Sequence, residues 1–207
     1  LEKQFKKSRQ ALEKALSLSG DHIPTYYELG LVLLAESEGV KAEDLLREAV
    51  RREPNNVVYS RALANAQTVN KKYDVALDSL LKLVKINPNT PGLLFDVCKN
   101  YSKKRFFTAA MDFCERSLKL KPKEPEIMNR LAWLYSKKRI KLDKGLELIQ
   151  RTIKLSPGNL KYTDTYAELL FAKGDTEGAI NIMTENIRVD PSNLYYKKQL
   201  FKFKKGP

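Results

Sequence analysis

Apolar and small residues recur along this chain at a fixed phase, with a period of 34 or 35 residues. A large residue precedes a small one at Leu29-Gly30, Leu63-Ala64, Val97-Cys98, Leu131-Ala132 and Tyr166-Ala167. Another small residue recurs at Ala42, Ala76, Ala110, Gly145 and Ala179, with a larger one four residues later at Leu46, Leu80, Cys114, Ile149 and Met183. Small residues let two helix backbones approach where they cross, and a spacing of four keeps the larger side chain on the same face. Each period is therefore predicted to be a pair of packed helices.

Prolines mark where the predicted helix pairs end. Pro54, Pro88, Pro122, Pro157 and Pro191 follow one another at intervals of 34, 34, 35 and 34 residues. Because proline cannot continue a helix, the second helix of each pair should end just before it. We expect the first helix of the five pairs to begin near Pro24, Val57, Pro91, Pro125 and Leu160. The extra residue of the longer interval should lie in a turn between Ala132 and Gly145.

This pattern resembles the tetratricopeptide repeat, whose spacing is W-x2-L-G-x2-Y, then A-x3-F, then P. Residues 23–56 match it with Tyr26, Leu29, Gly30, Ala42, Leu46 and Pro54. Departures are single positions, with Ser60 and Thr163 in place of an aromatic residue and Gln67 in place of tyrosine. The resemblance implies an all-α, right-handed solenoid of antiparallel helix hairpins. We expect repeats at 23–56, 57–90, 91–124, 125–159 and 160–193, with 1–22 the second helix of a truncated repeat and 194–207 a capping helix.

No motif in the chain predicts catalysis. It contains no glycine-rich phosphate loop, no nucleophile elbow and no cluster of cysteine and histidine, and its single histidine, His22, falls in a turn. We therefore expect no enzymatic activity, no cofactor and no metal. Cys98 and Cys114 occupy positions that small or medium apolar side chains fill in the other repeats, which favours buried thiols over a disulfide or a metal pair.

The resemblance also indicates where a partner would bind. In tetratricopeptide stacks, the inner face of the first helix of each pair lines a concave groove. The residues at these positions are Tyr27, Leu31, Arg61, Asn65, Phe95, Lys99, Asn129, Arg130, Trp133, Asp164, Glu168 and Phe171. Trp133 is either a ligand contact or packs on the first helix of a neighbouring pair, which would bury it without a ligand. Asp164 and Glu168 either form a solvated face or contact a basic group of a partner.

The net charge of +13 suits an acidic partner, such as a nucleic acid, anionic headgroups or an acidic protein. Cations gather in the turns between the two helices of consecutive pairs, which gives a basic edge of Lys71, Lys72, Lys103, Lys104, Arg105, Lys137, Lys138, Arg139 and Lys141. Lysines in solvated turns need no function, so this edge is either a polyanion-binding surface or merely solvated.

We interpret the chain as a soluble segment of a longer protein, with no targeting segment in it and no apolar run long enough to span a membrane. Stacked repeats offer an extended surface, which favours a non-catalytic scaffold that holds an extended segment or a helix of a partner protein in the groove. Two alternatives are weak binding of nucleic acid or an anionic surface through the basic edge, and end-to-end self-assembly into homo-oligomers. The compartment is left open.

Overall fold

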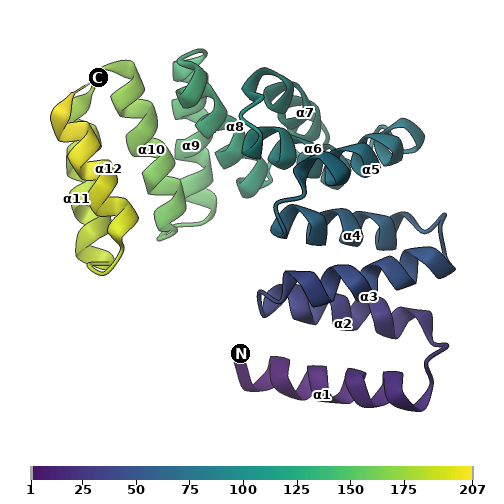
Figure 1. The fold of residues 1–207 in the computed structure, drawn as a ribbon. Coiled ribbons are helices and arrows are strands. Elements are labelled where there is room, and N and C mark those ends of the chain that lie inside the picture. The colour runs from purple at the N-terminus through teal and green to yellow at the C-terminus, as the bar shows by residue number, and fades with distance from the viewer. Residues whose placement is uncertain (1, 207) are drawn as a thin grey trace. The chain divides into compact units, whose positions relative to one another are not determined.

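The computed structural model describes residues 2–206, and the side chains of residues 6–206. Within this range the chain forms twelve α-helices and no strand, as the repeat pattern predicts. The chain divides into two compact units, Leu1–Lys104 and Arg105–Pro207. Figure 1 labels the helices of each unit.

The first unit contains α1 (Glu2–Leu18), α2 (Ile23–Ala35), α3 (Gly39–Arg52), α4 (Val57–Val69), α5 (Tyr73–Ile86) and α6 (Pro91–Lys103). Each helix packs on the next along the chain, and α2 also contacts α4, as α4 does α6. The first helices of three consecutive hairpins, α2, α4 and α6, therefore lie next to one another in this unit.

The second unit contains α7 (Phe107–Leu120), α8 (Pro125–Lys138), α9 (Leu142–Leu155), α10 (Leu160–Lys173), α11 (Thr176–Val189) and α12 (Leu194–Lys205). Successive helices again pack together, and α8 contacts α10. The helices α2, α4, α6, α8 and α10 begin within one residue of the positions that the sequence predicts, which confirms those helix starts.

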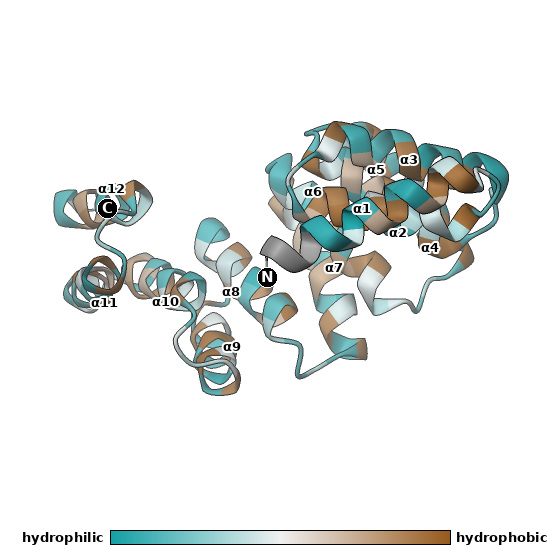
Figure 2. Cartoon of the chain, turned by 90° about the horizontal axis from the view of Figure 1, so that it is seen from below, coloured by the Kyte–Doolittle hydropathy of each residue, from teal (hydrophilic) through white to brown (hydrophobic). Residues whose placement is uncertain are grey.

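The core consists of the recurring small and large residues. Ala64, Ala132 and Ala167 are fully buried, and so are Leu46 and Met183. A Cβ atom on Gly30 would lie 2.7 Å from Cγ of Leu46, so α2 and α3 approach closely because Gly30 has no side chain. Figure 2 shows the resulting amphipathic character, with hydrophobic and hydrophilic positions on the same helices.

The cysteines differ from the sequence-based interpretation. Cys98 and Cys114 are fully buried, as expected for positions that fill the core. However, neither is a free thiol, because the described residues include no free cysteine. The interpretation as buried thiols is therefore wrong. None of the described helices is long and apolar enough to cross a bilayer.

Candidate functional site

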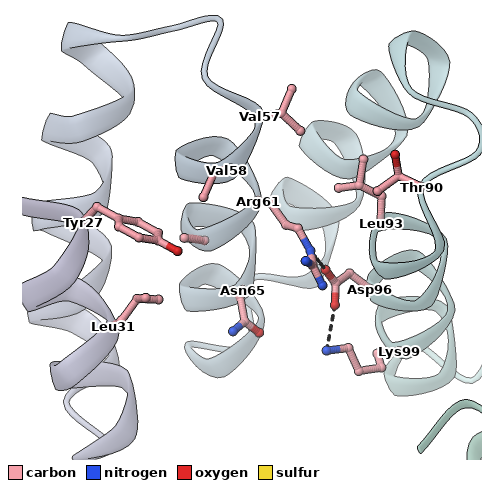
Figure 3. Close-up of a pocket in the computed structure, with 11 residues that line it drawn as sticks. Tyr27, Leu31, Val57, Val58, Arg61, Asn65, Thr90, Leu93, Asp96 and Lys99 are labelled. Carbon is pink, nitrogen blue, oxygen red and sulfur yellow. Dashed lines mark hydrogen bonds and ion pairs between the residues drawn. The ribbon is translucent and has the colours of Figure 1, made fainter. Parts of the chain in front are cut away.

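The inner faces of α2, α4 and α6 surround a cavity of about 370 Å³ in the first unit (Figure 3). Five of the residues predicted to line the groove lie around this cavity: Tyr27, Leu31, Arg61, Asn65 and Lys99. The other lining residues are Val57, Val58, Ala62, Thr90, Leu93 and Asp96. Phe95, which the repeat register also assigns to the groove, does not line it and instead packs under the Lys99 ammonium, 5.3 Å from its ring centre.

Helix α4 supplies the central wall of this cavity. Asn56 caps the start of α4 by accepting hydrogen bonds from the backbone N–H groups of Val58 at 3.0 Å and Tyr59 at 3.2 Å. Arg61 and Asn65 follow at a spacing of four, which places both on the same face of α4. Figure 3 shows both side chains between α2 and α6.

One wall of the cavity is cationic and is organised by Asp96. Nε of Arg61 donates to Oδ2 of Asp96 at 2.5 Å, and Nζ of Lys99 lies 2.8 Å from Oδ1 of the same carboxylate. A Cβ atom on Gly92 would lie 2.7 Å from Nη2 of Arg61, so the guanidinium rests against the glycine backbone. Two cations share one buried carboxylate, and this wall keeps one uncompensated positive charge.

The opposite wall of the cavity is apolar. The rings of Tyr27 and Tyr59 lie with centroids 5.2 Å apart, which fixes Tyr27 against α4. Leu31 and Val58 are 39% and 54% exposed, although both are aliphatic. The cavity thus offers apolar surface on one side and hydrogen-bond donors on the other, which suits a peptide segment that carries both kinds of side chain.

In the second unit, Trp133 packs on a helix of the same unit. Its ring meets that of Phe107 on α7 edge to face, with centroids 5.8 Å apart. The guanidinium of Arg130 and the ammonium of Lys137 lie 5.5 and 5.4 Å from the Trp133 ring centre. Trp133 is half-buried as a result, but α7 is the second helix of the preceding pair, not the first helix that the packing interpretation named.

Two neighbours of Trp133 carry buried polar atoms without a hydrogen-bond partner among the described residues. These atoms are Oδ1 of Asn129 and Nε of Arg130. Burial lowers the pKa of Arg130, which lies near Glu126 but forms no ion pair with it. The repeat register assigns both residues to the groove, and both are half-buried on α8.

Asp164 and Glu168 on α10 do not form a solvated face, and that interpretation is wrong. Glu168 is only 5% exposed. It accepts hydrogen bonds from Lys137 on α8 at 2.8 Å, and from Gln199 at 2.7 Å and Lys202 at 3.1 Å on α12. Burial alone would raise the pKa of Glu168, but Lys137 and Lys202 hold it below its usual value. The basic groups that meet this carboxylate belong to the same chain.

Asp164 sits beside this network. The Tyr195 hydroxyl on α12 donates to its Oδ2 at 3.0 Å, whereas its Oδ1 is buried and has no partner among the described residues. Burial, with a smaller contribution from the Glu168 charge, raises the pKa of Asp164 to about 6. Phe171, the last predicted groove residue, is buried against Phe203, with ring centroids 4.8 Å apart. Helix α12 thus packs against the inner face of α10 through these hydrogen bonds and this ring contact.

The basic edge is partly neutralised by acids from neighbouring helices. Lys72 pairs with Glu43 at 2.9 Å, Lys137 with Glu168 at 2.8 Å and Lys141 with Glu115 at 2.7 Å, and Lys104 pairs with Asp74. The other members, Lys71, Lys103, Arg105, Lys138 and Arg139, are exposed. Left-handed backbone conformations occur at Lys71, Arg105, Arg139 and Lys141, with φ of 62°, 64°, 51° and 48°.

No family model and no curated protein sequence matches the chain, but solved structures do. A thermophilic TPR protein of Thermus thermophilus, TTC0263, aligns with a TM-score of 0.69 at 17% identity, over 87% of this chain and 98% of that one. The APC/C hetero-tetramer Cut9-Hcn1 aligns with a TM-score of 0.86 at 15% identity, over 97% of this chain and 40% of that one. YrrB, described as a TPR protein with an unusual peptide-binding site, aligns with a TM-score of 0.65 at 16% identity, over 92% and 97%.

Proposed function

We propose, on the premise that this chain has the tetratricopeptide-repeat fold, that it is a non-catalytic scaffold whose first unit docks an extended segment or a helix of a partner protein. The fold itself, predicted from the repeat, is confirmed by the solved structures that match at high TM-score. Those neighbours include a hetero-tetramer and a protein with a peptide-binding site, which supports an interaction role in general. Fold alone does not specify the partner.

The cavity between α2, α4 and α6 carries the proposal. It is lined by five residues that the repeat register predicts for the groove, and it combines exposed aliphatic side chains with the donors of Arg61, Asn65 and Lys99. A docked segment would place an apolar side chain on Leu31 and Val58, and an acceptor near the guanidinium of Arg61. We do not extend the docking site to Asp164 and Glu168, because α12 already meets these carboxylates.

A random-peptide library displayed against the chain would test the docking site, followed by titration of the recovered peptides. The double variant Leu31→Ser, Asn65→Ser should weaken their binding at least about tenfold, because it removes one apolar and one polar contact. Its matched control is Val75→Ser, which changes an aliphatic side chain that is 51% exposed on α5, outside the cavity. Peptides that bind the double variant and the wild type equally would show that this cavity is not the docking site.

A further inference from the structure

The outer face of α12 carries a line of apolar residues between two rows of lysines. At about 100° per residue, Leu194 and Phe201 fall on one line, with Lys197 and Lys204 on one side and Lys198 and Lys205 on the other. All six residues are exposed, and Leu194 and Phe201 retain 67% and 61% of their accessible surface. The opposite face of α12, with Tyr196, Gln199 and Phe203, is buried.

The charges of this face are not compensated within the described part of the chain. None of Lys197, Lys198, Lys204 and Lys205 has an ion-pair partner among the described residues, and α12 contains no acidic residue. Lys202, which lies nearer the inner side of the helix, is by contrast paired with Glu168 at 3.1 Å. The α12 face therefore concentrates four positive charges around two exposed apolar side chains.

We propose that the outer face of α12 lies on an anionic lipid surface. Leu194 and Phe201 would enter the boundary between headgroups and acyl chains, and the four lysines would meet anionic headgroups on both sides of them. Long lysine stems keep their ammonium groups in the polar layer while the apolar line is buried. Anionic headgroups in a fluid leaflet can move to meet the two rows of lysines, so the partner needs no acidic groups at fixed positions.

A lipid surface explains this face better than a protein or a nucleic acid does. The centres of protein interfaces are depleted of lysine, whereas lysine supplies four of the six residues here. Sequence-independent binding of single strands uses aromatic rings as stacking platforms, but Phe201 is the only ring on this line of the helix, and the ammonium of Lys205 covers one of its faces at 4.5 Å from the ring centre. A nucleic-acid backbone would contact the lysines through its phosphates but would not bury the aliphatic side chain of Leu194.

Co-sedimentation with vesicles tests this proposal. The chain should sediment with vesicles of phosphatidylcholine mixed with phosphatidylserine, and much less with phosphatidylcholine alone. Replacing Lys197, Lys198, Lys204 and Lys205 by Glu should weaken this binding at least about tenfold, since each basic residue near an anionic leaflet adds to affinity. The variant Leu194→Ser, Phe201→Ser should weaken binding too, and its loss should persist at high salt, where charge contributes less.

A matched variant separates this face from general basicity. Replacing Lys71, Lys103, Lys138 and Lys154 by Glu changes the net charge equally, at exposed positions on other parts of the chain than α12. This variant should retain most of the binding, and all variants should keep the wild-type melting temperature within a few degrees. The proposal is overturned if mixed vesicles fail to bind the chain or if both charge-reversal variants lose binding equally. It is also overturned if the serine variant binds like the wild type, or if heparin or RNA is bound more tightly than the vesicles and competes them away.

Discussion

Nε of Arg61 on α4 donates to Oδ2 of Asp96 on α6 across 2.5 Å, which joins two helices through the wall of the proposed docking cavity. The same carboxylate holds Lys99 at 2.8 Å, so one acid positions both cations that face the cavity. Asp96 is buried, whereas Arg61 is exposed and turns its remaining guanidinium nitrogens toward Gly92.

Replacing Asp96 by Ala should therefore destabilise the chain by about 1–3 kcal/mol, because it leaves two cations without their shared acceptor. Chemical unfolding followed by circular dichroism would measure this loss. Asp44→Ala is the control, since Asp44 pairs with Arg47 at the surface, where both side chains are more than half exposed. A loss at Asp96 no larger than that at Asp44 would mean that the Asp96 pair does not support the cavity wall.

Trp133→Ala should cost about 1–3 kcal/mol, less than the roughly 3–5 kcal/mol of a fully buried aromatic residue. The reason is that Trp133 is half-buried and rests on Phe107 through an edge-to-face contact. Thermal unfolding of the Trp133→Ala variant would measure this loss. Phe201→Ala is the control, because Phe201 is 61% exposed and its replacement should change stability by less than about 0.5 kcal/mol. Equal melting temperatures for the two variants would contradict the packing role of Trp133.

Lys71→Gly should stabilise the chain by up to about 1 kcal/mol. Lys71 has a φ of 62°, which is a left-handed backbone conformation. This conformation is unfavourable for a residue that has a Cβ atom, whereas glycine adopts it at little energetic cost. The reciprocal change, Gly174→Ala at a φ of 99°, should destabilise by about 1–2 kcal/mol. Melting curves of both variants would decide whether the turn conformation is strained, and the hypothesis fails if the two changes shift stability in the same direction.

Asp164→Asn should stabilise the chain at pH 8 and have little effect at pH 4. Burial raises the pKa of Asp164 to about 6 from the 3.8 that is ordinary for an aspartate, so the folded state binds the proton more tightly than the unfolded state does. The protonated Asp164 carboxyl therefore stabilises the folded state below the pKa that Asp164 has in the unfolded chain. This stabilisation is lost as the pH rises from about 4 through about 6. Urea unfolding of the wild type and the variant across this range would measure the difference, which we expect to be about 1–2 kcal/mol.

The pKa of Glu168 shifts on folding in the direction opposite to that of Asp164, so Glu168 provides the comparison. Its pKa is lowered in the folded state despite burial, because Lys137 and Lys202 stabilise its charge. Its contribution is therefore present above the unfolded pKa and is lost as the pH falls. Glu168→Gln should destabilise the chain at pH 8 and less so at pH 4. If the two variants respond to pH in the same direction, this assignment of the carboxylates is wrong.

The helix starts and the buried small residues could be predicted because they depend on local spacing. The phase that selects Ala64 and Ala167 also selects a helix face, and burial of that face follows from the packing of consecutive helices. Tyr27, Arg61 and Asn65 line the cavity of the first unit because the register places them on matching faces of α2 and α4, whereas Phe95, from the same register, does not line it.

The partners of the inner-face acids could not be predicted in this way. The helical period assigns Glu168 to a face, but Lys137 lies 31 residues before it and Lys202 lies 34 after it. Which of many lysines reaches a given carboxylate depends on side-chain length and helix crossing, and neither is visible in spacing. Asp96 lies 35 residues after Arg61, which is close to one repeat and places the two residues side by side in the stack, but this spacing does not show that they form an ion pair.

The ion pairs between helices described above have a kinetic consequence. Lys72 and Glu43 are 29 residues apart, and the pairs of the inner face span 31 to 35 residues, so each closes a loop of about one repeat or less. Closing short loops costs little entropy, and chains dominated by such contacts fold fast. Folding can then start at any hairpin and spread to its neighbours. A substitution in α3 should consequently change hydrogen-exchange protection in α2 and α4 while leaving α10 and α11 unaffected.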